Sequence, residues 1–393
     1  MAVGVFVQSG SRHEPQQFAG ISHLIEHMLF KGTPTRRPID ITRAIEGRGG
    51  NFNAMTGEEA TCFYAHLPDD YLEEAVDILS DMYLRATIPE DEFVREKQVV
   101  IEEIKMYADE PDAVAMENLQ RSLFPGSALG RPVAGTAGSL APLGPEDLRR
   151  YIRSHYRADN TVVVVAGSFE CGRALELVER AFSPLGKQRR QAVASRSRFA
   201  RPSPSRVSVD KDVQQAQLAL GYRTFGVPDP RKYAATVMDA VLGRGMSSRL
   251  FQEVREKRGL SYDISSRMQF FSDAGMFTVT AGVDPSKAEM ALATTDRELR
   301  RICEKRVSAA ELRRTRDFLV GNFRLSHERV TSKLFFYGQT MLAFGRLVTP
   351  EEQVEGIRAV TPADVQAAAR SIFVPSARAE SWVVPRGGRA AGK

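Results

Sequence analysis

One short apolar stretch, residues 20–30, constrains this 393-residue chain more than any other. It predicts a helix, because Gly20 and Ser22 stand where a helix start is expected and no proline interrupts the run that follows. On such a helix His23 and His27 are four residues apart, so both imidazoles leave the same face one turn apart. Two neutral imidazoles in this arrangement can bind one zinc ion.

A glutamate, Glu26, lies beside the histidine pair and completes the pattern H-x-x-E-H, an inverted form of a zinc-peptidase motif. A carboxylate at this position can take a proton from water activated by the metal without being a ligand. Two histidines at this spacing also occur on ordinary helix surfaces, so the motif alone leaves both interpretations open. The apolar surroundings favour the metal site, because polar groups in such a run need a partner.

A third ligand is needed, since a catalytic zinc usually takes three protein ligands and leaves one position for water. The best candidate region is residues 93–105, which predicts a second helix after Pro89 and an acidic first turn. Glu96 and Glu103 are seven residues apart and share a face, whereas Glu102 points about 100° away from Glu103. One of the two aligned carboxylates could bind the metal while the other holds a histidine or the bound water. The spacing does not decide between them.

The motif and the later glutamate resemble peptidase family M16, whose members include the mitochondrial processing peptidase, pitrilysin and insulin-degrading enzyme. Further strings similar to this family run through most of the chain, at residues 29–33 (LFKGT), 50–56 (GNFNAMT), 129–136 (LGRPVAGT) and 247–251 (SSRLF). The resemblance implies that His23, His27 and Glu103 are the zinc ligands and Glu26 the general base. It also implies that Glu96 supports the ligands without binding the metal.

The same resemblance assigns residues that would bind the substrate. Arg255 and Tyr262 fall on an arginine and a tyrosine that reach the substrate from the second half of the family's clamshell, although spacing alone favours a surface arginine and a half-buried tyrosine. Asn53 and Ala54 fall on the edge strand to which M16 substrates add as an extra β-strand, although they could also form an ordinary hairpin. Arg244 is a departure, because the family commonly has glycine there, and its side chain could narrow the chamber.

Composition and charge exclude several other classes. The net charge of +5 is mild for this length, and its excess is concentrated in residues 187–206, so it does not indicate nucleic-acid binding. Three widely spaced cysteines, Cys62, Cys171 and Cys303, argue against a disulfide framework and for a reducing compartment, which we expect to be the cytoplasm. No apolar run reaches the length of a membrane span, and the chain opens in a strand pattern rather than a signal peptide.

The predicted fold is α+β, with two homologous domains that each pack a mostly antiparallel sheet with helices. A strand–helix–strand–strand–helix order occurs twice along the chain, and the second copy lacks the histidine pair. We therefore expect a zinc-binding catalytic domain at residues 1–186, a basic linker at 187–207, a metal-free repeat at 208–386 and a disordered tail at 387–393. M16 proteins usually have one or two further strands ahead of this start, so either these are absent or the start site is assigned too far downstream.

These observations lead to the hypothesis of a zinc endopeptidase that cleaves extended or unfolded peptides. Half-length family members close face to face as pairs, and each partner supplies the arginine and tyrosine that serve the other's zinc. Because this chain has both sets of residues, we expect a homodimer, with a heterodimer containing an M16-like partner still open. The rival hypothesis is a catalytically silent structural or partner subunit of an M16-type complex.

Overall fold

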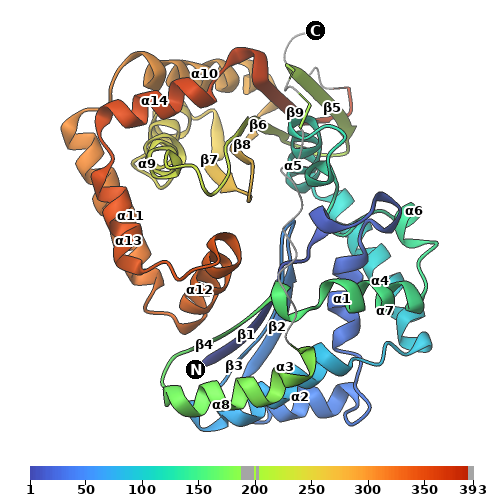
Figure 1. Cartoon of the computed structure of the whole chain (residues 1–393). Helices are drawn as coiled ribbons and strands as arrows, with labels where there is room; N and C mark the ends of the chain where they lie inside the picture. The colour runs from blue at the N-terminus through green and yellow to red at the C-terminus, as the bar shows by residue number, and fades with distance from the viewer. Residues whose placement is uncertain (187–198, 201–202, 388–393) are drawn as a thin grey trace. The chain divides into compact units, whose positions relative to one another are not determined.

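The protein is described by a computed structural model that covers residues 1–186, 199–200 and 203–387. The described residues divide into two compact units (Figure 1). The first comprises residues 1–105, 131–186 and 325–348, and the second comprises the remaining described residues. Each unit packs helices against one largely antiparallel sheet, which confirms the predicted α+β class.

The first unit is built on a four-stranded antiparallel sheet in the order β2-β3-β1-β4. Its strands are β1 (Ala2–Val7), β2 (Asn51–Thr56), β3 (Thr61–His66) and β4 (Thr161–Ala166). β1 lies between β3 and β4 and places Val5 opposite Phe63 and Val163. β2 forms an edge of the sheet, because β3 is its one neighbour.

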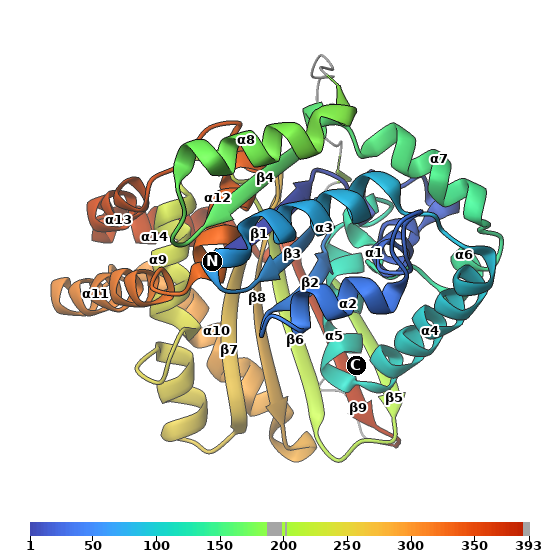
Figure 2. The same cartoon turned by 90° about the horizontal axis from the view of Figure 1, so that it is seen from below.

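Both faces of this sheet are covered, since successive side chains of a strand point to opposite faces. Val3, Val5 and Val7 of β1 belong to the main core of the unit, together with helices α1 (Ile21–Leu29), α3 (Leu72–Arg85) and α8 (Cys171–Phe182). Figure 2 shows α3 and α8 running over this sheet. Ala2 and Phe6 face the other way, toward α12 (Val330–Phe344). A Cβ at Gly338 of α12 would lie 2.4 Å from the Phe6 ring, so this close packing requires glycine.

The remaining helices of the first unit are α2 (Pro38–Glu46), α6 (Ala137–Leu140), α7 (Pro145–His155) and the long α4 (Glu90–Asp109), whose last turn belongs to the second unit. Proline opens α2 and α7, where its missing N–H would have no intrahelical partner. In the described part of the chain, no helix combines the length and the apolar character that a membrane crossing requires.

The second unit has a five-stranded sheet in the order β5-β9-β6-β8-β7. Its strands are β5 (Ser205–Lys211), β6 (Ala216–Thr224), β7 (Ser261–Phe270), β8 (Gly275–Val283) and β9 (Arg378–Pro385). Four of them, in the order β7-β8-β6-β9, repeat the order β2-β3-β1-β4 of the first unit, and all of these pairs are antiparallel. β5 is an addition that pairs with β9 in parallel. The two halves of the chain therefore share one topology, as the repeated pattern predicted.

Helices cover both faces of the second sheet as well. On one face lie α9 (Lys232–Gly243), α10 (Ala288–Glu304) and α14 (Pro362–Ile372), with α11 (Ala309–Ser326) and α13 (Pro350–Ala359) beyond them. On the other face α5 (Pro111–Leu123) packs Leu119 and Leu123 against Ala219 and Val383. Thus α5, from the first half of the sequence, belongs to the second unit, while α12, from the second half, belongs to the first.

The structure corrects two details of the sequence prediction. The linker cannot extend to residue 207, because β5 begins at Ser205. Helix α5 was not predicted. Residues Phe251–Glu256 form a π-helix. Residues 187–198 and 201–202 of the linker, and 388–393 of the expected disordered tail, lie outside the described residues. The contiguous domains 1–186 and 208–386 stay a prediction, and the compact units differ from them by the exchange of α5 and α12.

Candidate metal centre

The helix that carries the H-x-x-E-H motif is α1, and its two faces have opposite character. One face is fully buried in the core of the first unit, and it carries Ile21, Leu24, Ile25, Met28 and Leu29. His23, Glu26 and His27 are half-buried on the other face. The apolar run thus fixes the rotation of α1 and directs all three polar side chains to the same side.

The second helix, α4, presents the two aligned glutamates as their spacing indicates. Phe93, Glu96 and Val100 are buried along one stripe of α4, and Glu103 continues that stripe as a half-buried residue. Glu102 is exposed and accepts hydrogen bonds from Gln98 and Lys105, both on α4 itself. The structure therefore directs Glu96 and Glu103, but not Glu102, toward the motif helix.

Three candidate ligands converge between these helices. His23, His27 and Glu103 offer one ligand atom each, and these atoms all lie within 4.8 Å of one another. Glu103 Oε2 is 3.7 Å from His23 Nε2 and 3.6 Å from His27 Nε2. These separations are too long for hydrogen bonds. They are close to the roughly 3.4 Å expected between two ligands of one tetrahedral zinc ion. In the described part of the chain, no other group of three such side chains is placed to hold a metal.

The other glutamate, Glu96, contacts His27 at the ring nitrogen Nδ1. Glu96 Oε2 lies 3.0 Å from His27 Nδ1, and because a carboxylate can only accept, this contact favours the tautomer with the proton on Nδ1, which leaves Nε2 to face Glu103. Lys31 Nζ lies 2.6 Å from the other oxygen of Glu96. Burial opposes ionisation of Glu96, but the hydrogen bonds from Lys31 and His27 hold the pKa of Glu96 below its usual value. Lys31 is a contributor that the sequence pattern did not single out.

Burial, and then the neighbouring His27, lower the pKa of His23, while Glu26 and Glu103 oppose that shift. A lowered pKa favours the neutral imidazole, the form that binds metals. Two atoms of the motif are buried without a hydrogen-bond partner among the described residues, namely His23 Nδ1 and Glu26 Oε2. Buried polar atoms without partners are uncommon and suggest an additional ligand or water. Two imidazole nitrogens and one carboxylate oxygen form a donor set that suits zinc, so the residues present fit that metal.

The predicted peptide-binding strand lies on the edge of the first sheet. Asn53 and Ala54 belong to β2, and Asn53 is exposed. The backbone N–H of Ala54 donates to the side-chain Oδ1 of Asn53 at 2.8 Å. This donor is therefore occupied by a side chain of the edge strand itself.

Arg255 and Tyr262 lie together in the second unit. The Arg255 guanidinium is 5.1 Å from the centre of the Tyr262 ring and 4.7 Å from that of the Phe251 ring, both within cation–π range. Arg255 belongs to the π-helix, a form that is frequent at functional sites, and the Tyr262 ring is 78% exposed. Both side chains are thus available to a ligand, and Phe251 is a neighbour that the sequence analysis did not identify.

Arg244, which departs from the family pattern, turns its side chain back toward the unit's own core. Arg244 Nε lies 2.5 Å from Oδ2 of Asp239, a fully buried residue of α9. Asp239 also accepts hydrogen bonds from Ser266 Oγ at 2.6 Å and from the backbone N–H of Met268 at 3.3 Å. Arg244 thus pairs with a buried carboxylate on α9. In the repeated order of elements, α9 has the place in the second unit that α1 has in the first.

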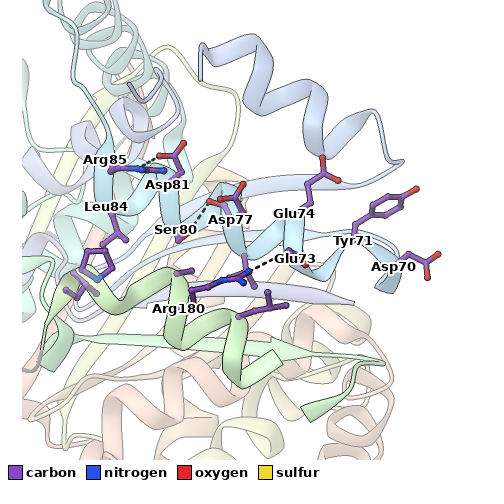
Figure 3. Close-up of a pocket in the computed structure, with 15 residues that line it drawn as sticks. Asp70, Tyr71, Glu73, Glu74, Asp77, Ser80, Asp81, Leu84, Arg85 and Arg180 are labelled. Atoms are coloured by element: carbon purple, nitrogen blue, oxygen red, sulfur yellow. Dashed lines mark hydrogen bonds and ion pairs between the residues drawn. The ribbon is translucent and has the colours of Figure 1, made fainter. Parts of the chain in front are cut away.

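A groove between α3 and α8 has an acidic lining, and several of its carboxylates form ion pairs with arginine side chains (Figure 3). Glu73 binds Arg173 and Arg180, which joins the two helices. Asp81 binds Arg85, and Figure 3 shows this contact along α3. These ion pairs stabilise the packing of α3 and leave the metal centre as the best candidate site.

Comparisons with known proteins match most of the chain. Residues 1–137 match the family model of insulinase (peptidase family M16), and residues 142–319 match that of the peptidase M16 inactive domain. The uncharacterized zinc protease YmxG of Bacillus subtilis is 34% identical over 373 residues, which cover 95% of this chain and 90% of the relative. The uncharacterized zinc protease SCO5738 of Streptomyces coelicolor is 35% identical over 375 residues, 94% of this chain and 82% of the relative.

Solved structures share the fold at lower sequence identity. A protease from Helicobacter pylori superposes with a TM-score of 0.92 at 20% identity, covering 98% of this chain and 93% of the other. A peptidase M16 inactive domain from Pseudomonas fluorescens gives 0.89 at 21% identity, covering 100% and 94%. A chain in the structure of complex III2 from Candida albicans gives 0.83 at 20% identity, covering 97% and 90%.

Proposed function

Because the chain belongs to peptidase family M16, we propose that it is a zinc-dependent endopeptidase that hydrolyses extended or unfolded peptides. The observation that carries the proposal is the convergence of ligand atoms from His23, His27 and Glu103 within 4.8 Å of one another. The names of the curated relatives as zinc proteases support the same metal and the same class of reaction.

In this proposal His23 and His27 hold zinc through their Nε2 atoms, and Glu103 holds it through a carboxylate oxygen. Zinc, when bound, supplies Lewis acidity that lowers the pKa of water and polarises the peptide carbonyl. Glu96 fixes the ring orientation and tautomer of His27, since it accepts the Nδ1 proton, and Lys31 keeps that carboxylate charged.

Glu26 is the general base of the proposed reaction. Its carboxylate takes a proton from water, so that the oxygen can add to the peptide carbonyl carbon. When the C–N bond breaks, the same carboxylate returns the proton to the leaving amine nitrogen. The unpartnered Oε2 of Glu26 supports this role, because no described side chain competes for the oxygen. No covalent bond to the protein forms.

Substrate binding is proposed for two further pairs. The edge of β2 at Asn53 and Ala54 offers backbone groups to an extended peptide. Binding of this kind favours unfolded segments and depends only weakly on the side chains of the peptide. The half-buried Arg255 and the exposed Tyr262 offer donors for substrate carbonyls, and the guanidinium is kept in place by aromatic rings.

We also propose a pairing of two chains, because one chain carries both the metal-binding residues and the arginine–tyrosine pair. A homodimer is the simplest pairing, and a heterodimer with an M16-like partner is its alternative. The three cysteines are free, which supports the proposed cytoplasmic location.

The second candidate function is a catalytically silent partner or structural subunit. The observation in its favour is the fold shared with a chain in the complex III2 structure. The complete H-x-x-E-H motif and the approach of Glu103 to both histidines favour the peptidase over this candidate.

The test measures zinc content and hydrolysis of an internally quenched peptide by the wild type and by Glu26→Gln. The matched control is Glu102→Gln, which changes an exposed glutamate of α4 that faces away from the centre. We expect near-stoichiometric zinc in all three proteins and loss of cleavage in Glu26→Gln alone. Zinc without cleavage in the wild type supports the silent subunit, and wild-type protein without zinc refutes the metal centre.

A further inference from the structure

The motif helix begins at an unusual cap. Helix starts leave N–H groups without intrahelical partners, and a side chain at the N-cap commonly satisfies one of them. The N-cap of α1 is Gly20, whose left-handed φ of 95° favours glycine. A Cβ at Gly20 would also lie 2.5 Å from the carbonyl oxygen of Ala134. A capping side chain cannot be placed at this position, so the cap must come from elsewhere in the chain.

Glu14 supplies that cap. Its Oε2 accepts from the backbone N–H of Gly20 at 2.8 Å, and its Oε1 accepts from that of Ser22, also at 2.8 Å. A negative charge at a helix start is favourable, because the helix dipole places partial positive charge there. Glu14 is only 4% exposed. Burial raises the pKa of this carboxyl, and the two N–H groups oppose the rise.

The segment around Glu14 is itself fixed. Arg131 Nη2 donates to the backbone oxygen of Glu14 at 2.7 Å and to that of Ser11 at 3.2 Å. A Cβ at Gly135 would lie 2.4 Å from the oxygen of Ala19, so the 129–136 string packs directly against the start of the helix. This gives the string a physical role as a support for α1.

The cap lies next to His23, the histidine of the motif whose Nδ1 has no hydrogen-bond partner among the described residues. His27 is oriented by Glu96, whereas His23 Nδ1 has no hydrogen-bond partner among the described residues. His23 directly follows Ser22, whose N–H is bound by Glu14. The position of His23 against Glu103 therefore depends on how firmly the backbone at the start of α1 is held.

We propose that Glu14 is a positioning residue for the metal centre, because it holds the backbone start of α1 and thereby sets His23 against Glu103. The inference rests on the zinc centre proposed above and not on the peptidase reaction. It assigns Glu14 no contact with metal or substrate.

The chain contains a matched control for this role. Glu170 also caps a helix through two backbone N–H groups, although it is the exposed N-cap residue of α8 itself, and it accepts from Gly172 at 2.7 Å and Arg173 at 2.5 Å. No proposed site residue lies on α8. Replacing either glutamate by glutamine changes a helix cap, but only Glu14→Gln changes the cap of the motif helix.

The experiment measures the zinc dissociation constant of the full-length protein by competition with a chromophoric chelator, for wild type, Glu14→Gln and Glu170→Gln. Loss of a group that orients a metal ligand typically weakens binding by about 10- to 100-fold. We expect Glu14→Gln to weaken zinc binding by at least about tenfold and Glu170→Gln by less than about twofold. Equal zinc affinities in the two variants, with both folded, would overturn the proposal.

A second variant keeps the test decisive if Glu14→Gln does not fold. Glu14→Asp retains the charge but shortens its reach, and we expect an intermediate loss of zinc affinity. Wild-type affinity in Glu14→Asp, where Glu14→Gln cannot be measured, overturns the inference. A wild type that binds zinc tightly but does not cleave peptides leaves this inference intact and refutes the peptidase, whereas a wild type that binds no zinc refutes both.

Discussion

Replacement of Arg244 by alanine will destabilise the second unit, because it leaves the buried Asp239 carboxylate without its countercharge. Asp239 is 0% exposed, and among the described residues it keeps two neutral donors after the change, the Ser266 hydroxyl and the Met268 backbone N–H.

The size of the effect follows from the burial of the two partners. Removing one partner of a buried ion pair costs about 3–5 kcal/mol. The Arg244 side chain is 36% exposed, so water can reach the space it leaves and screen the carboxylate. We therefore expect about 2–3 kcal/mol for Arg244→Ala, which lowers the melting temperature by roughly 4–12 °C for a unit of this size.

Trp382 makes the measurement specific to this unit. It is the one tryptophan of the sequence, and it is fully buried in β9 of the second sheet. Urea unfolding followed by its fluorescence reports on the sheet against which α9 packs. Arg231→Ala serves as control, because Arg231 forms an exposed pair with Asp229 that should contribute at most about 1 kcal/mol.

A double-mutant cycle with Asp239→Asn completes the test. If the carboxylate and the guanidinium are coupled, the double variant will be more stable than the sum of the single changes predicts, by at least about 1 kcal/mol. A loss below about 0.5 kcal/mol for Arg244→Ala, or additive effects in the cycle, would refute the reasoning.

Two further predictions concern the first unit. Burial would raise the pKa of Asp81, but hydrogen bonds from neighbouring threonine and arginine side chains hold it below the usual 3.8. The unfolded state then binds more protons below that value, so the stability that Asp81 contributes is full above about pH 4 and is lost on acidification. Urea midpoints of wild type and Asp81→Asn should converge as the pH falls from 4 toward 2, and a constant difference would contradict this. Asn53→Ala removes the side chain that binds the Ala54 N–H. When Asn53→Ala is added to a catalytically inactive variant, the protein should bind an extended peptide about two- to tenfold more tightly than the inactive variant alone, as measured by fluorescence anisotropy. Unchanged or weaker binding would contradict the idea that the Asn53 side chain and the peptide compete for the Ala54 N–H.

The sequence predicted the two helices of the metal centre because their signals are local. The apolar spacing in residues 20–30 determines which face of α1 is buried, and the seven-residue spacing of Glu96 and Glu103 places both on one face of α4. The spacing could not distinguish the roles of these glutamates, since both have the same orientation on the helix, and only the family resemblance assigned them different roles. Tertiary packing brings Glu103 near both Nε2 atoms and Glu96 to His27 Nδ1, and this difference supports the roles proposed for them.

Other features depend on contacts between distant segments and leave little local signal. β5 alternates in burial, but it pairs with β9 from the far end of the chain and follows an arginine-rich stretch typical of a linker. The exchange of α5 and α12 depends on which sheet face each helix covers, which periodicity does not specify. Glu14 lies in a polar loop without periodicity, and its role is visible only from the two N–H groups it accepts from.

The most direct test of the account is an anomalous difference map at the zinc edge from crystals of the zinc-loaded protein. We expect one strong peak per chain, about 2.0–2.1 Å from His23 Nε2 and His27 Nε2 and about 2.0–2.2 Å from a Glu103 carboxylate oxygen. Glu96 should remain hydrogen-bonded to His27 Nδ1 and outside the coordination sphere. A peak at other side chains, or zinc bound by Glu96 in place of Glu103, would contradict the proposed centre.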